Sequence, residues 1–434
     1  MQLMRFVVFL LLGFYAQITF ASLPIQYWLT SSGVRVYFVE SRDLPILDIS
    51  INFSAGSSMD TPEKSGHANL TRRLMSLGAG GFNEDQIAIA LADVGALQGG
   101  SFDRDRASFS LRTLSSESER TQALDIFSRI IQHPEFPESI LARERARVIA
   151  GIKEANMKPD YIASRALMEM LYDDHPYGLS GSGEIGVLEK VTREDLVAFY
   201  QTYYTAKNAV IAIMGDVSRI EAANIAESLT RELSSGEDNI LLSPVQLPKS
   251  EIKKIAHPAT QSHILMAYPG LRRDDPDYFP LLVGNYILGG GGFVSRLMQE
   301  IRQKHGLAYS VHSYFAPFKE QGPFQIGLQT KKDQADEALR LTQDVLKKFV
   351  ANGLTENELV AAKQNIVGGF PLRIDSNQKI IGYLAMIGFY DLPLTYLGDY
   401  IKAVEAVTVT QIKDAFQRRI NPEGMVTVVV GAAE

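Results

Sequence analysis

Hydrophobic and polar residues alternate at several places in the first half of the chain, with the two-residue period of a β-strand. Around Ser31-Ser32-Gly33, two such runs flank a turn of small residues, which predicts a β-hairpin. Other runs place apolar residues three and four positions apart, as on one face of a helix. The predicted strands are 26–39, 47–53, 101–114 and 208–214. The predicted helices are 66–76, 84–94 after a capping Asn83, 121–132, a long stretch at 138–171, a helix from Thr192 to 203, and 220–233.

Residues 234–250 follow neither period and indicate a linker between two domains, 22–233 and 251–434. The second half then repeats the order of elements of the first. Similar segments begin at Gln122 and Glu337, which lie 215 positions apart (337 − 122). The predicted strands are 262–268, 308–315 and 322–330. The predicted helices are 278–288, 293–304, 333–350 and 355–367.

This repetition predicts an α+β fold with an internal duplication. Each copy is a domain of roughly 200 residues, in which helices pack on an antiparallel-rich sheet as a sandwich. The alternative is two unrelated α+β domains, because such patterns recur in proteins without common ancestry.

The N-terminus has the pattern of a secretory signal peptide. Arg5 precedes an apolar core at 6–14, and small residues before position 22 would permit cleavage after Ala21. We therefore expect residues 1–21 to direct export, and an exported chain without cysteine fits a bacterial periplasm. An uncleaved membrane anchor is the alternative, and no later stretch is apolar and long enough to span a bilayer.

Composition excludes several classes of function. The chain has 434 residues, a formal net charge of −7 and no cysteine. The negative charge argues against a general nucleic-acid-binding protein, which would need cations to neutralise phosphates. The lack of cysteine excludes disulfides and zinc–thiolate sites. A metal would need His, Asp or Glu ligands, and only seven histidines are present.

A run of four glycines, Gly289, Gly290, Gly291 and Gly292, precedes the predicted helix 293–304. Arg302 lies near the end of that helix, and Tyr309 begins the next predicted strand. Glycine runs permit sharp bends and close approach of another backbone. The run lacks the Lys-Ser/Thr of a phosphate-binding loop. A plain flexible connection remains open as an alternative.

Several features in order resemble the pitrilysin or insulinase-type zinc peptidases, the inverted zincins, over nearly the whole chain. They are the early hairpin, Gly56-Ser57-Ser58, the helix after Gly66, His175-Pro-Tyr-Gly178, the glycine run, Ser295-Arg-Leu297 and Arg302 to Ser310. The resemblance implies two sandwich domains that form one half of a clamshell. It also implies an H-x-x-E-H motif on the helix after Gly66, with two zinc-binding histidines and a general base.

The chain departs from that motif at each position. By alignment on Gly66, Asn69 replaces the first histidine, Arg72 the general base and Arg73 the second histidine. The third ligand falls near Gly151, which has no side chain to offer. Arginine stays protonated and has no lone pair for a metal. We therefore expect no cofactor in this chain. Glu144 matches a family carboxylate, and His67 has no second histidine one turn away.

The resemblance also gives Arg302 and Tyr309 a role. In the family, the matching pair reaches from the second domain to the zinc cavity, holds substrate and assists the developing oxyanion. Arginine and tyrosine are both hydrogen-bond donors, as such a role requires. The alternative is a solvent-facing cation at a helix end and a half-buried strand residue.

The sequence therefore predicts a non-catalytic subunit of a heterodimeric periplasmic zinc peptidase. Arg302 and Tyr309 would act at a zinc site on a homologous partner chain, and Gly289 to Gly292 would contact a peptide or unfolded protein substrate. One alternative is a scaffold subunit without a proteolytic role. Another is a metallopeptidase with a relocated metal site, although the sequence shows no ligand set for it.

Overall fold

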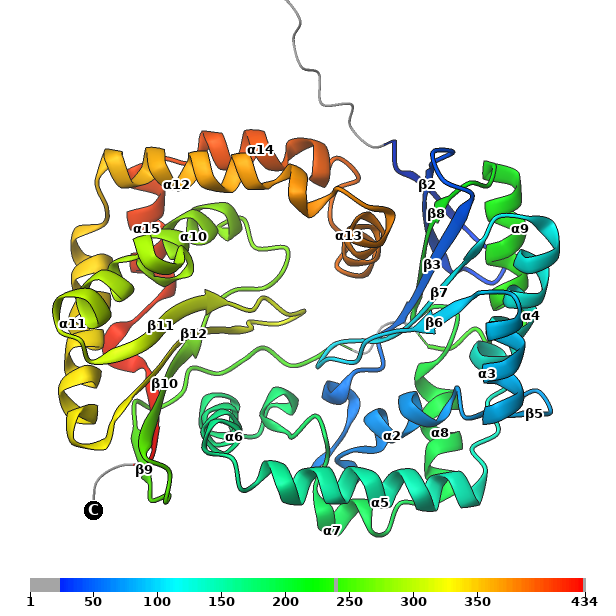
Figure 1. The fold of residues 1–434 in the computed structure, drawn as a ribbon, viewed down its shortest axis with the longest axis horizontal. Coiled ribbons are helices and arrows are strands. Elements are labelled where there is room, and N and C mark those ends of the chain that lie inside the picture. Colours follow the sequence, from blue (N-terminus) through cyan, green and yellow to red (C-terminus); the bar gives the residue numbers. More distant parts are fainter. Residues whose placement is uncertain (1–23, 238–240, 432–434) are drawn as a thin grey trace, which may run out of the picture.

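The protein forms two α/β halves, each with its own sheet (Figure 1). The structure is a computed structural model, and it describes residues 24–237 and 241–431. The predicted signal segment, residues 1–21, lies outside these ranges. In the order in which they pair, the strands of the first sheet are β1 (Gln26–Leu29), β2 (Arg35–Glu40), β8 (Ala209–Gly215), β3 (Ile46–Phe53), β7 (Ala107–Leu114) and β6 (Leu97–Gly99).

The second sheet follows the same plan. In pairing order its strands are β11 (Ala308–Phe315), β12 (Pro323–Lys331), β10 (Gln261–Pro269), β13 (Val426–Val430) and β9 (Ile252–Ile255). The order β6-β7-β3-β8-β2 of the first sheet matches β11-β12-β10-β13-β9 of the second. In both, only the last pair is parallel. β10 also begins 215 residues after β3 (261 − 46). The topology therefore confirms the predicted α+β fold and its internal repeat.

Helices cover the sheets and contribute apolar side chains to both cores, together with the strands. The helices of the first half are α2 (His67–Leu74), α3 (Glu84–Asp93), α4 (Glu117–Gln132), α5 (Glu138–Ala155), α6 (Pro159–Tyr172), α7 (Ile185–Leu188), α8 (Arg193–Tyr203) and α9 (Arg219–Thr230). Those of the second half are α10 (Tyr278–Asn285), α11 (Ala335–Asn352), α12 (Glu356–Gly369), α13 (Asn377–Phe389), α14 (Tyr396–Ala406) and α15 (Val409–Arg419). A small two-stranded sheet joins β4 (Gly78–Ala79) to β5 (Phe82–Asn83). None of the helices in the described ranges combines the length and hydrophobicity that a bilayer-spanning segment needs.

The two halves exchange one helix each. Helix α6 of the first half packs on β10 and β13 of the second, where Leu167 and Leu171 meet Val428 in a shared apolar cluster. Helix α13 of the second half packs on β2, β3 and β8 of the first, and Leu384 joins Met214 in another cluster. Figure 1 shows α6 and α13 on either side of the space between the sheets. Each sheet therefore depends on the other half for part of its apolar cover.

Three predicted elements differ from the structure in ways with a local cause. The predicted helix 138–171 was wrong as a single element, because it is interrupted at 156–158 and Pro159 opens α6. Proline has no N–H to donate and suits only the first turn of a helix. The predicted strand 101–114 starts only at Ala107, because Asp103 accepts the N–H groups of the next turn. The predicted helix 293–304 is a 3₁₀ turn followed by a π-helical segment, Met298–Lys304.

Candidate functional site

Helix α2 carries the positions at which the sequence predicted a lost zinc motif. It starts after Gly66, whose φ of +99° lies in the left-handed region that favours glycine. The buried Asp60 carboxylate accepts hydrogen bonds from the N–H groups of Gly66 (2.8 Å) and Ala68 (2.9 Å). Burial raises the pKa of Asp60 to about 7, although both N–H groups act to lower it. These contacts hold the first turn of α2 in place.

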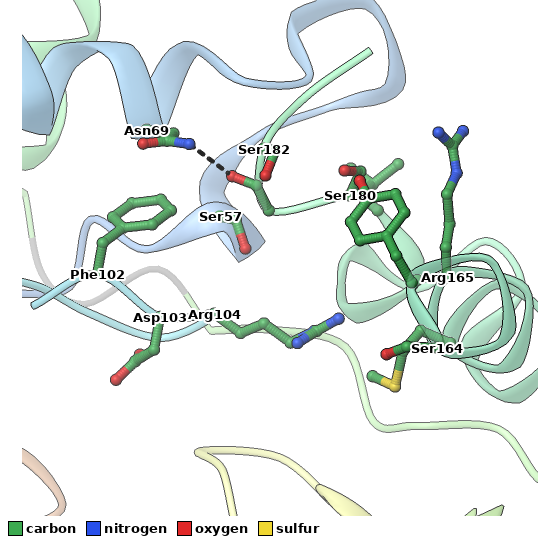
Figure 2. Close-up of a pocket in the computed structure, with 14 residues that line it drawn as sticks. Ser57, Asn69, Phe102, Asp103, Arg104, Ser164, Arg165, Ser180 and Ser182 are labelled. Atoms are coloured by element: carbon green, nitrogen blue, oxygen red, sulfur yellow. Dashed lines mark hydrogen bonds between the residues drawn. The ribbon is translucent and has the colours of Figure 1, made fainter. Parts of the chain in front are cut away.

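Asn69, at the first substituted position, faces a cavity. Its amide Nδ2 donates to the carbonyl oxygen of Gly181 at 3.2 Å, which ties α2 to the loop 178–182 (Figure 2). The side chain is half-buried and lines the cavity wall. An amide in this position joins two segments of the same half by a neutral hydrogen bond.

Arg72 turns towards the edge of the first sheet. Its Nη2 donates to the carbonyl oxygen of Ser108 at 2.9 Å, and its Cζ lies 4.6 Å from the centre of the Phe109 ring. Nη2 also reaches the carbonyl of Gly99 at 3.4 Å. Burial lowers the pKa of the Arg72 guanidinium. The Arg72 guanidinium thus links α2 to β6 and β7, and its hydrogen bonds go to carbonyl oxygens of the sheet.

Arg73 pairs with Glu144, which the sequence analysis matched to a carboxylate of the family. Its Nε lies 2.6 Å from Oε2 of Glu144, whose side chain is only 1% exposed. Arg143 and Arg147 donate to the other oxygen of Glu144 at 2.9 and 2.6 Å. Burial acts to raise the pKa of Glu144, but hydrogen bonds from Arg73 and Arg143 outweigh it and lower the pKa. Glu144 is therefore a buried anion held by three guanidinium groups.

Arg302 and Tyr309, which the sequence analysis matched to a functional pair of the family, lie in contact in the second half. The Arg302 Cζ lies 4.5 Å from the centre of the Tyr309 ring and 4.8 Å from that of Phe293. Tyr309 is 80% exposed and Phe293 is 63% exposed. The guanidinium thus lies between two aromatic rings at the surface, an arrangement that favours a cation. Both polar ends remain accessible to a molecule outside the chain.

The glycine run is packed mostly against its own chain. Gly289 ends a buried segment, and a Cβ there would lie 2.3 Å from Ser313 Oγ and 2.6 Å from Ser313 N. A Cβ at Gly290 would meet Asn285, and one at Gly291 would lie 2.7 Å from the carbonyl oxygen of Tyr286. Only Gly292, with a φ of +61°, has open space at that position. Packing therefore accounts for three of the four glycines, and substrate contact stays a prediction.

Two groups of residues escaped the sequence analysis. One is the Asp105 cluster, formed by Asp105, Tyr177, Tyr390 and Lys319. The buried Asp105 carboxylate accepts from the hydroxyls of Tyr177 (2.6 Å) and Tyr390 (3.0 Å) and from the N–H of Lys319 (2.8 Å). The other is the cavity that Asn69 lines. Both groups combine residues from segments that are far apart in the chain, so no local spacing of residues predicts them.

Comparison with family models and solved structures shows which protein family the chain belongs to. Residues 36–183 match the family model described as insulinase (peptidase family M16), and residues 190–366 match the peptidase M16 inactive domain. A crystal structure of a peptidase M16 inactive domain from Pseudomonas fluorescens is 38% identical, with a TM-score of 0.91, over 94% of this chain and 98% of that chain. The chain belongs to peptidase family M16. Within that family it is an inactive-type homologue.

Curated M16 relatives with lower identity carry different names. The chain is 24% identical to the "uncharacterized zinc protease YmxG" of Bacillus subtilis, over 82% of this chain and 86% of the relative. It is 23% identical to the "non-peptidase homolog YmxG" of Helicobacter pylori, over 94% of both. A structure titled as a protease from Helicobacter pylori has a TM-score of 0.83 at 17% identity, over 94% of this chain and 99% of that one. That last likeness shows the fold alone.

The residues of this M16 chain do not fit the zinc ion that the family implies. Arg72 and Arg73 are cations without a lone pair, and both are engaged by protein oxygens. Gly151 lies exposed on α5, and a Cβ there would meet nothing within 4 Å. Within residues 24–237 and 241–431, no three His, Asp or Glu side chains are grouped so that they could share a metal.

Proposed function

We propose that this chain is the non-catalytic subunit of a heterodimeric zinc peptidase, and that it supplies Arg302 and Tyr309 to a zinc site on its partner. One observation carries the proposal. The zinc-ligand positions are occupied by Asn69, Arg72 and Arg73, whereas the Arg302–Tyr309 pair is assembled and accessible. The side chains of Asn69, Arg72 and Arg73 are hydrogen-bonded to other protein atoms. The zinc ion and its ligands would therefore come from another chain.

The chemistry of Arg302 and Tyr309 suits a tetrahedral intermediate of peptide hydrolysis. A guanidinium offers several N–H donors in a fixed plane, and a phenol adds one O–H donor. Such donors stabilise negative charge that develops on the carbonyl oxygen of the substrate. The Arg302 guanidinium is stacked between the rings of Tyr309 and Phe293, and this limits the motion of its side chain. The entropy cost of holding Arg302 in place is therefore lower.

The partner in this proposal is a homologous chain with an intact H-x-x-E-H motif, which binds the zinc ion. The substrate is a peptide or unfolded protein enclosed between the two chains, and the glycine run would pass close to it. The complex would act in the periplasm, to which residues 1–21 would direct this chain. The net charge of −7 is consistent with a role that involves no nucleic acid.

Reconstitution with the partner tests the proposal. We expect peptide hydrolysis only when both chains are present, and we expect a chelator to abolish it. In the pair, Arg302→Ala should lower kcat/KM by about tenfold to a hundredfold, because one donor to the oxyanion is lost. Arg340→Ala, at an exposed position on α11, is the matched control and should have no effect. Chelator-sensitive hydrolysis by this chain alone would refute the proposal.

The name of the Helicobacter pylori relative, a non-peptidase homolog, favours a second candidate. In that case the chain is a structural subunit, and Arg302 has no chemical role. A reconstituted pair in which Arg302→Ala leaves hydrolysis unchanged, while omission of the whole chain abolishes it, would select this second function.

A further inference from the structure

A cavity of about 320 Å³ lies beside Asn69, between α2, the turn before β7, α6 and the loop 178–182 (Figure 2). This volume is at the lower end of the range of small-ligand pockets. It is separate from Arg302 and Tyr309, which lie in the second half. Its wall includes several polar groups that have no hydrogen-bond partner among the described residues. The polar residues on which the argument rests are Ser57, Asn69, Arg104, Ser164, Ser180 and Ser182.

Four serine hydroxyls line the cavity and make no hydrogen bond with any residue in the described part of the chain. They belong to Ser57, Ser164, Ser180 and Ser182. In the loop, the N–H groups of Ser180, Gly181 and Ser182 also find no acceptor among the described residues. A hydroxyl can donate or accept, but a free N–H can only donate. The loop therefore offers free N–H donors, and the four serine hydroxyls can act as donors or acceptors.

Arg104 adds a positive charge to these donors. Its Nε donates to the carbonyl of Tyr177 at 3.0 Å, and its Cζ lies 5.9 Å from the centre of the Phe318 ring. No described carboxylate pairs with it, and its two terminal nitrogens have no acceptor among the described residues. Figure 2 shows its guanidinium extending into the space below Ser57 and Ser180. Burial lowers the pKa of Arg104, and the charges of Asp105 and Asp103 act in the opposite direction.

The other charges of the wall are neutralised. Asp103 accepts hydrogen bonds from the N–H and guanidinium of Arg106. In Figure 2 its carboxylate points away from the Arg104 guanidinium. Arg165 is paired with Glu169 and Glu184, at 2.9 and 2.8 Å. Arg104 is thus the one cation of the cavity wall that forms no ion pair with a described residue, and the more distant carboxylates of Asp103 and Asp105 favour its charged form.

We propose that this cavity binds one carboxylate group of a peptide, with the Arg104 guanidinium as its main partner. A guanidinium fits the two oxygens of a carboxylate through parallel N–H bonds. A single cation outside any ion pair suits one negative charge, whereas a phosphate dianion would call for further cations. The choice of a peptide as the source of the carboxylate rests on the proposed function, and the cavity lies wholly within this chain.

The carboxylate could belong to the C-terminus of a peptide or to an acidic side chain. Three acetylated alanine peptides of equal length distinguish these sources by calorimetric titration of the purified chain. One ends in a free carboxylate, one in an amide, and one in an amide with a single internal glutamate. Tighter binding of the first identifies the C-terminus as the ligand, and tighter binding of the third identifies the acidic side chain.

Two substitutions test the role of the cavity. Arg104→Met should weaken binding of the preferred peptide by about tenfold to a hundredfold, since a charge-assisted hydrogen-bond pair is lost. Ser164→Leu, at an exposed position of α6, should fill the cavity and weaken binding without disturbing the core. Arg340→Met is the matched control for loss of one positive charge and should bind as the wild type does.

Equal binding of all three peptides would overturn the proposal. So would an Arg104→Met or Ser164→Leu protein that is folded by circular dichroism and binds the preferred peptide with unchanged affinity. These measurements need no partner chain and no hydrolysis. Failure of the carboxylate site is therefore distinguishable from failure of the proposed function, which is measured through Arg302 in the reconstituted pair.

Discussion

Glu144 illustrates at the scale of single residues how this chain stabilises a buried carboxylate beside the helix on which the sequence analysis expected a substituted zinc motif. A carboxylate that is 1% exposed would be costly without partners. Arg73, Arg143 and Arg147 donate to its two oxygens. The substitution at position 73 thus supplies a fixed cation near a buried carboxylate. These three guanidinium groups compensate the buried negative charge without any metal.

Glu144→Gln should therefore destabilise the protein at neutral pH. We expect a loss of about 2 kcal/mol in the free energy of unfolding, because hydrogen bonds from charged donors are weakened. The measurement is urea unfolding at pH 7. Glu154→Gln is the control. Glu154, on α5, forms an exposed ion pair with Lys158, and its substitution should change the free energy of unfolding little. Equal effects of the two substitutions would contradict the assigned role.

The Glu144 carboxylate also makes the free energy of unfolding depend on pH. The pKa of Glu144 is lowered in the folded chain, so its stabilising contribution is present above the ordinary value of 4.5. It is lost as pH falls through the lowered folded-state pKa. The difference in unfolding free energy between wild type and Glu144→Gln should therefore narrow below about pH 4.5. A difference that stays constant down to pH 3 would refute this account.

The glycine run is best understood at the scale of elements. A π-helical turn, Tyr286–Gly290, follows α10 and brings Gly289 against β11. There Asn285 donates to the carbonyl of Ser313 at 3.1 Å and accepts from its hydroxyl at 2.6 Å. The absent side chain at Gly289 permits this contact. The run thus holds the edge strand that begins with Ala308 and Tyr309.

Gly289→Ala should destabilise the protein by about 1–3 kcal/mol, because the new methyl group would overlap Ser313. Gly368→Ala is the matched control on α12, where a Cβ meets nothing within 4 Å. That change should stabilise the chain by about 0.5–1 kcal/mol, since alanine favours a helix interior. Thermal unfolding measures both. Stabilisation by both substitutions would show that Gly289 is not confined by packing.

At the scale of the whole molecule, the two halves are joined by exchanged helices and by the Asp105 cluster. Helix α13 also places Gly388 against the other half, where a Cβ would lie 2.6 Å from atoms of Tyr37 and Val210. Asp105 of the first half accepts hydrogen bonds from the hydroxyl of Tyr390 and from the N–H of Lys319, both of the second half. The relative position of the cavity and of Arg302 follows from these contacts.

Tyr390→Phe should reduce the free energy of unfolding by about 1–2 kcal/mol, because the buried Asp105 carboxylate loses one donor. Tyr383→Phe, on the helix α13 that precedes Tyr390, is the control, since the Tyr383 hydroxyl makes no hydrogen bond with a described residue. A double-mutant cycle with Asp105→Asn should show coupling for Tyr390 and none for Tyr383. Absence of coupling at Tyr390 would show that this contact does not hold the halves together.

Much of the fold was predictable because its signals are local. The hairpin at Ser31-Ser32-Gly33, the cap at Asn83 and the strand after Leu307 all occur where alternation and turn residues predicted them. The break before Pro159 was missed because the helical spacing of apolar residues continues across it. The meeting of Arg302 and Tyr309 came from family resemblance, since seven intervening positions alone do not predict a contact.

The sequence by itself determined the order of elements, their repetition after 215 positions and the substitutions at Asn69, Arg72 and Arg73. These features depend on residue identity and on spacing within a few turns. Only the tertiary structure decided that Arg73 meets Glu144, that α6 and α13 cross between halves, and that Arg104 extends into a donor-lined cavity. Such contacts join residues far apart in the chain, and their energies arise only once both sheets are packed.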